Sequence, residues 1–83
     1  MSDGCLASGW NWIWPEPEEG RALACEVKTF YRQKPLAARI ESLGGGAVRV
    51  IYDEPHQKAV PGQAVVAYAG DDVIGGGTID SWF

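Results

Sequence analysis

The chain has 83 residues, with seven basic and eleven acidic side chains and a formal net charge of −4. This length is typical of a single domain (1–83) and leaves little room for a deep, enclosed active site. Because free-standing nucleic-acid binders are usually basic, contact with RNA would require a local basic patch. Two cysteines and one histidine are too few for a structural zinc site, and no apolar run reaches the ~18–20 residues of a membrane-spanning helix.

Residues 5–14 predict the first strand. Trp10, Trp12 and Trp14 recur at every second position, so they would share one face of it. That face would belong to the core or be covered by a neighbouring domain; a platform on which bases stack is the alternative. Residues 1–4 are expected to be a boundary segment before this strand, and the proline-rich residues 15–20 end it.

Residues 23–32 predict the second strand, because its side chains alternate in character with a period of two. One face would carry Leu23, Cys25, Val27, Thr29 and Tyr31, and the other Glu26, Lys28, Phe30 and Arg32. The first face is the more apolar one and is expected to point inward.

Residues 36–41 and 47–52 predict a third and a fourth strand. The glycines at 44–46 can take positive φ without steric cost and are expected to join the two strands as a hairpin. Residues 53–55 are expected to end the fourth strand in a turn.

Residues 64–68 predict a fifth strand, and a turn at 70–72 leads to the sixth. The sixth strand is expected to begin at Val73, to be interrupted by the glycines at 75–77 and to resume at Thr78. Six short strands with eleven glycines and no helical periodicity predict an all-β domain, either a small six-stranded antiparallel barrel or a sandwich.

A basic and aromatic patch at the end of the second strand is the most suggestive surface feature. Lys28, Phe30 and Arg32 would share the outer face, and Lys34 follows directly. Cations neutralise phosphates, and an aromatic ring can stack on an unpaired base. A solvated outer strand face, with Phe30 covered by a neighbouring element, is the alternative.

Catalytic chemistry is not expected from this chain. Its acidic clusters at 16–19, 53–54 and 71–72 fall in apparent turns, where carboxylates are commonly just solvated. Neither glycine run lies between a strand and a helix, as a phosphate-binding loop requires. Cys25 is expected to be an inward-facing, inert thiol, because no cation is placed to lower its pKa.

The order of several short motifs is more specific than any one of them. These motifs are Asn11-Trp12-Ile13, Cys25-Glu26-Val27-Lys28, Tyr31-Arg32-Gln33-Lys34-Pro35, Tyr52-Asp53-Glu54-Pro55, Pro61-Gly62-Gln63-Ala64-Val65, Tyr68 and Ile74-Gly75-Gly76-Gly77-Thr78-Ile79. In this order, from about residue 6 to 79, the chain resembles the C-terminal domain of bacterial tRNA-specific 2-thiouridylases.

The resemblance implies a β-barrel similar to the second domain of elongation factor Tu, within a cytoplasmic parent enzyme. That enzyme would use ATP to adenylate C2 of the wobble uridine and replace the oxygen with sulfur from a cysteine persulfide. Its ATP site and reactive cysteines would lie in an N-terminal catalytic domain, and a sulfur-relay protein would be the donor. Neither Cys5 nor Cys25 matches those cysteines, so no catalytic residue, cofactor or metal site is expected in this chain.

The resemblance also sharpens the basic patch. The family pattern Lys-x-Arg-Tyr-Arg-Gln is matched at Lys28 and at 31–33, but Phe30 replaces the middle arginine. Val60 also departs, where the family usually has threonine. Contacts with the tRNA anticodon arm are expected from Lys28, Arg32, Gln33 and Lys34, with Arg39 as a flank. The alternative is a purely structural domain that packs on the catalytic domain and makes no RNA contact.

Overall fold

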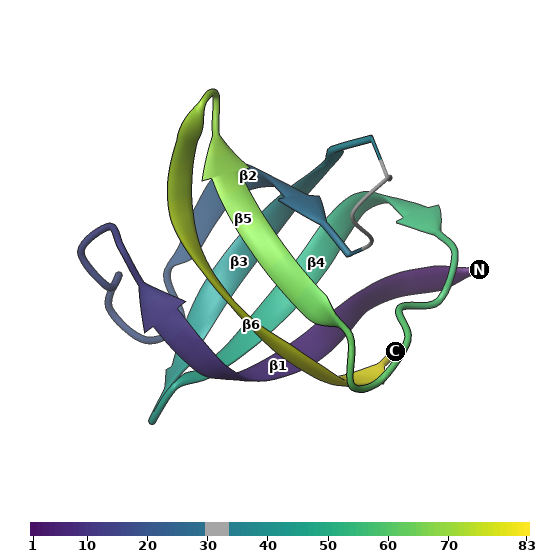
Figure 1. The fold of residues 1–83 in the computed structure, drawn as a ribbon, viewed down its shortest axis with the longest axis horizontal. Helices are drawn as coiled ribbons and strands as arrows, with labels where there is room; N and C mark the ends of the chain where they lie inside the picture. Colours follow the sequence, from purple (N-terminus) through teal and green to yellow (C-terminus); the bar gives the residue numbers. More distant parts are fainter. Residues whose placement is uncertain (30–33) are drawn as a thin grey trace.

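The computed structural model describes residues 1–29 and 34–83, which form a closed antiparallel barrel of six strands (Figure 1). The strands are β1 (Ser2–Trp12), β2 (Ala22–Lys28), β3 (Leu36–Gly44), β4 (Ala47–His56), β5 (Ala64–Ala69) and β6 (Asp72–Trp82). Their order around the barrel is β1-β4-β3-β2-β5-β6, and β6 pairs back to β1. The predicted six-stranded antiparallel barrel is therefore confirmed. No helix in the described residues is long and apolar enough to cross a membrane.

Branched aliphatic side chains fill the interior, as the period-two alternation predicted. The most deeply buried, each at most 1% exposed, are Val27, Ile40, Val48, Val50, Val65, Ile74 and Ile79. On β2 the alternation is clear, because Val27 is buried whereas Glu26, one position before it, is exposed. Because side chains alternate along a strand, the buried residues direct their neighbours, such as Lys28, to the outer surface of the barrel.

A bulge at Gly9 changes which residues of β1 face the core. Gly9 has a φ of 59°, and the register of β1 against β6 shifts around it. The buried residues just before the bulge, Cys5 and Ala7, are odd-numbered, whereas Trp10 just after it is even-numbered. The rings of Trp10 and Trp12 lie 5.7 Å apart between centroids at 53°. The predicted aromatic face is confirmed, and it packs against the core.

The bounds of all six strands differ from those predicted, and the differences at β1 and β4 are linked. β1 begins at Ser2, not at residue 5, and ends at Trp12. β4 continues through residues 53–55, which were expected to form a turn, as far as His56. The early start of β1 and the late end of β4 have one cause, because Ser2 pairs with His56 and so extends both strands.

β6 is continuous, which corrects the expected interruption at 75–77. Gly75 and Gly76 pair with β5 on one side and with β1 on the other, so the ladder runs through the glycines. A Cβ on Gly75 would lie 2.7 Å from Nε1 of Trp10, and one on Gly77 would lie 3.1 Å from Cε3 of the same ring. Side chains are excluded at Gly75 and Gly77 because backbone oxygens of β1 and the Trp10 indole occupy the space that they would need.

Candidate nucleic-acid interface

The outer face of β2 presents Lys28 beside an aromatic ring from β5. β2 pairs with β5 at its end, where Glu26 lies opposite Tyr68 and Lys28 lies opposite Val66. The Lys28 ammonium nitrogen lies 5.9 Å from the centroid of the Tyr68 ring. That distance is at the outer limit of a cation–π contact, so Lys28 is oriented toward the ring without being tightly held.

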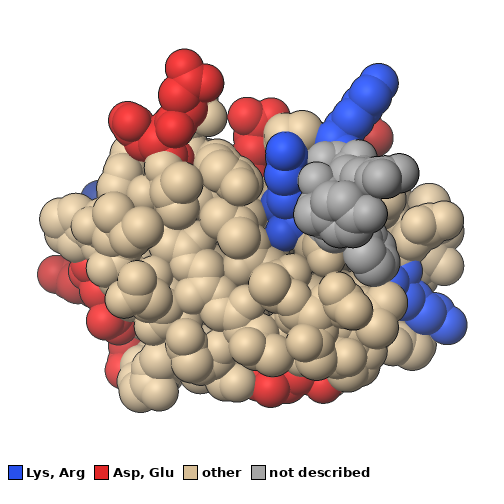
Figure 2. Space-filling view, viewed as in Figure 1, with Lys and Arg blue, Asp and Glu red and all other residues tan. Residues whose placement is uncertain are grey.

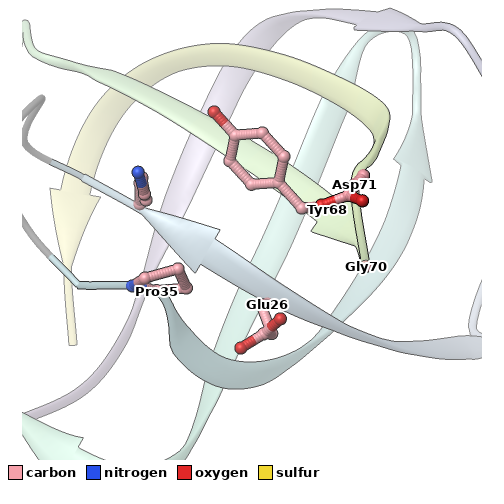
Figure 3. Close-up of a pocket in the computed structure, with 6 residues that line it drawn as sticks. Glu26, Pro35, Tyr68, Gly70 and Asp71 are labelled. Carbon is pink, nitrogen blue, oxygen red and sulfur yellow. The ribbon is translucent and has the colours of Figure 1, made fainter.

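Lys28 and Tyr68 line a pocket of about 240 Å³ with residues from three other places in the chain. Pro35 precedes β3, Glu26 belongs to β2, and the β5–β6 turn contributes Gly70 and Asp71. Figure 3 shows Tyr68, Pro35 and Glu26 on three sides of this space, with Asp71 beside Gly70 on the fourth. A second pocket, of about 390 Å³, shares Pro35 and is lined further by Leu36, Ala37, Asp53 and Glu54.

The structure brings some of the predicted RNA-contacting residues together. Lys28 is half-buried in the pocket wall, and Lys34 is exposed next to Pro35. Arg39 is exposed on β3 but lies opposite Ala24, four positions along β2 from Lys28. Four strand positions correspond to roughly 13 Å, so Arg39 does not join the pocket. Arg32 and Gln33, like residues 30 and 31, lie outside the described residues.

Charges of both signs surround the pocket. Lys28 and Lys34 are accompanied by Glu26 and Asp71, and the neighbouring pocket adds two more carboxylates. Figure 2 shows that blue basic atoms gather mainly toward one side of this face, with red acidic atoms close to them. A uniform positive field that would hold any polyanion is therefore absent from the described part of this face. Phosphate contacts here would have to be made by individual side chains.

Sequence reasoning singled out Lys28 but not its pocket partners. In the sequence, Tyr68 and Pro35 stand out only as parts of the series of short motifs. What joins them to Lys28 is the pairing of β2 with β5, two strands that are separated by β3 and β4 in the chain. The one available signal was Glu26, which shares the outer face of β2 with Lys28.

The acidic residues that the sequence groups in clusters occupy structural positions in the barrel. Ser42 donates a hydrogen bond of 2.6 Å from its hydroxyl to a Glu16 carboxylate oxygen, which fastens the 13–21 segment to β3. Asp53 and Glu54 lie within β4, and Asp72 begins β6. Among the described residues, no group of three or more His, Cys, Asp or Glu side chains could hold a metal ion.

Both cysteines are free thiols held in their protonated form. Burial raises the pKa of Cys5 to about 11, although a hydrogen bond with Tyr52 opposes part of this effect. Burial raises the pKa of Cys25 to about 12, and the negative charges of Asp53 and Glu26 add to it. Because the thiolate is the reactive form, neither cysteine is set up as a nucleophile near neutral pH.

We therefore expect both thiols to react slowly with iodoacetamide at pH 8 in the folded protein. Raised pKa values leave almost no thiolate at that pH, whereas an unfolded cysteine, with a pKa near ~8.5, is partly ionised. Mass spectrometry should find alkylation accelerated many-fold in denaturant, and the rate in the folded state should keep rising with pH until the pH approaches about 11. Rapid labelling of native Cys25 at pH 8 would show that its thiol is activated.

Comparison with known proteins gives a consistent family match. The family described as "Aminomethyltransferase beta-barrel domain" matches residues 2–79. A tRNA-specific 2-thiouridylase MnmA of Salmonella arizonae is 41% identical over 80 residues, which are 96% of this chain and 22% of that protein. The proteins of the same name from Geotalea uraniireducens and Carboxydothermus hydrogenoformans are each 42% identical, over 79 and 82 residues. These cover 95% and 96% of this chain, and 20% and 22% of the relatives. The chain thus spans about a fifth of the length of these relatives.

Proposed function

The chain belongs to the aminomethyltransferase β-barrel domain family, and on that premise we propose that it is the accessory barrel of a tRNA 2-thiouridylase. In this role the end of β2 helps to position the tRNA while the chemistry proceeds in another part of the protein. The relatives that match nearly the whole chain are named for that activity. A cytoplasmic location follows from the same proposal.

The observation that carries the positioning role is the grouping of Lys28, Tyr68 and Lys34 at one end of the barrel. A flexible cation beside a partly exposed ring offers the two interactions that unpaired RNA uses, phosphate neutralisation and base stacking. Arg32 and Gln33 follow Lys28 closely in the sequence and are part of the same proposal. Arg39 is proposed only as an outlying contact, because of its distance along the sheet.

ATP and the sulfur-carrying cysteines are assigned to the rest of the parent protein, as is binding of a sulfur-relay donor. The glycines of this barrel do not fit a nucleotide phosphate, since residues 44–46 form the β3–β4 turn and Gly75 faces the Trp10 ring. Cys5 and Cys25 are protonated thiols, which are poor acceptors and donors of persulfide sulfur. No catalytic step is therefore placed on this chain.

A second candidate function is packing against the catalytic domain without any contact with RNA. The mixed charges around the pocket favour it, as do the exposed apolar side chains Ile13, Trp82 and Phe83. Exposed apolar side chains mark a surface that a partner covers where they form a contiguous patch, and Trp82 and Phe83 are consecutive in the chain.

Hydrogen–deuterium exchange in the full-length protein, with and without tRNA, separates the two functions. Contact with tRNA should slow amide exchange in the β5–β6 turn at Gly70 and Asp71, which borders the pocket. The β3–β4 turn at Gly45 lies at the other end of the barrel (Figure 1) and serves as an internal control. If the β5–β6 turn is protected equally with and without tRNA, the barrel packs on protein and the positioning role is wrong.

A further inference from the structure

We propose that the pocket between β2 and β5 binds a single unpaired base of the RNA and prefers guanine over uracil. This inference rests on the proposed function, since it identifies what the RNA inserts at that surface. The pocket is the one lined by Glu26, Lys28, Pro35, Tyr68, Gly70 and Asp71. Accordingly, it would not receive the uridine that the enzyme modifies.

The size of the pocket and its walls suit one flat ring system. Its volume, about 240 Å³, is below the roughly 300–1,000 Å³ typical of pockets for drug-sized ligands. Tyr68 supplies an aromatic face and Pro35 a flat apolar ring across from it (Figure 3). A base could stack on Tyr68, an interaction that tolerates any base and contributes affinity without sequence preference.

The preference comes from the two carboxylates. Glu26 and Asp71 are exposed at the pocket, and neither forms an ion pair among the interactions of the described residues. An ionised carboxylate only accepts hydrogen bonds, so it favours a base edge that carries donors. Guanine presents two adjacent donors, N1–H and the 2-amino group, which can pair with both oxygens of one carboxylate. Uracil presents one N–H between two carbonyl oxygens, which a carboxylate would repel.

Lys28 argues for a nucleotide over the basic side chain of a protein. An arginine could also stack on Tyr68 and pair with Glu26 or Asp71. However, its guanidinium would then lie beside the Lys28 ammonium, which already faces the same ring at 5.9 Å. A neutral base avoids this repulsion, and its phosphate gives Lys28 a partner of opposite charge. The aromatic ring, the proline ring, the carboxylates and the ammonium group of the pocket would then each contact the nucleotide.

The test measures binding of the fluorescein-labelled pentaribonucleotides UUGUU and UUUUU to the full-length protein. We expect UUGUU to bind about tenfold more tightly, and we expect this ratio to fall close to one in whichever variant, Glu26→Ala or Asp71→Ala, removes the carboxylate that pairs with guanine. Tyr68→Ala should weaken both oligonucleotides. Asp72→Ala is the matched control, because it removes the same charge from the next residue, outside the pocket; it should leave the ratio unchanged. UUIUU, whose inosine lacks the 2-amino group, should bind between the two.

The direction in which replacing a carboxylate changes RNA binding separates base recognition from simple repulsion of phosphates. If Glu26 and Asp71 only repel phosphates, their replacement should tighten binding of both oligonucleotides as Asp72→Ala does, and base recognition is wrong. A ratio near one in the wild-type protein also overturns it. If the pocket takes an arginine of another domain, the oligonucleotides show no preference, and the same two variants lower the melting temperature of the full-length protein. Each of these results can occur while tRNA still slows exchange at the β5–β6 turn, so failure of this inference is distinguishable from failure of the proposed function.

Discussion

Gly75→Ala should destabilise the barrel by about 3–5 kcal/mol, one of the largest effects we expect from a single substitution. The added methyl group would meet the backbone oxygen of Asn11 and lie 2.7 Å from Nε1 of Trp10. A backbone atom cannot move aside by changing rotamer, and Trp10 is only 6% exposed within the core. β6 would have to move away from β1, at the seam where these two strands close the barrel.

Urea unfolding followed by circular dichroism measures this effect, and the melting temperature should fall by roughly 15–30 °C. The matched control is Gly20→Ala, in which no atom lies within 4 Å of the added group and only the φ of 80° is unfavourable. That control should cost about 1 kcal/mol. Equal stability of Gly75→Ala and the wild-type protein would show that the indole does not fill this space.

Features of the fold that are local to one strand could be predicted from the sequence, whereas features that depend on pairing between strands could not. Alternation identified all six strands, because each has one buried face with a period of two. It could not predict that β6 runs through three glycines, since the reason is pairing with β5 on one side and with β1, more than sixty residues earlier, on the other. Nor could the sequence predict that the inward-facing positions of β1 change at Gly9, because a bulge depends on how two strands pair.

The candidate site could likewise be predicted from the sequence only in part. That Lys28 faces outward follows from the burial of Val27, which local alternation indicates. Tyr68 and Asp71 reach Lys28 only through the non-sequential order of β2 and β5 around the barrel. Local pattern therefore predicts which side chains are exposed, but the topology decides which of them meet. The roles of Arg32 and Gln33 stay predictions.

The central claim, that the end of β2 contacts tRNA through cations, predicts a large effect of replacing Lys28, Arg32 and Lys34 together with alanine. Each lost phosphate contact should reduce the slope of log Kd against log salt concentration by about one, since fewer counterions are released on binding. Three contacts lower the affinity at least about tenfold near physiological salt. The fold should survive, because Lys28 is half-buried and Lys34 is exposed on the outer surface.

The matched control replaces Arg21, Arg49 and Lys58, which removes the same charge from other parts of the barrel. Arg49 pairs with Glu41 at 3.7 Å, and Lys58 lies 4.2 Å from the Trp82 ring centroid, so both already have partners away from the pocket. If the tRNA affinity depended only on net charge, the two triple variants would behave alike.

The most direct measurement is therefore the salt dependence of tRNA affinity for the full-length protein and both triple variants. We predict that the variant lacking Lys28, Arg32 and Lys34 loses affinity and about three units of slope, while the control variant stays close to the wild-type protein. Unchanged affinity and slope in the first variant, with its fold intact, would contradict the claim and assign the barrel to packing alone.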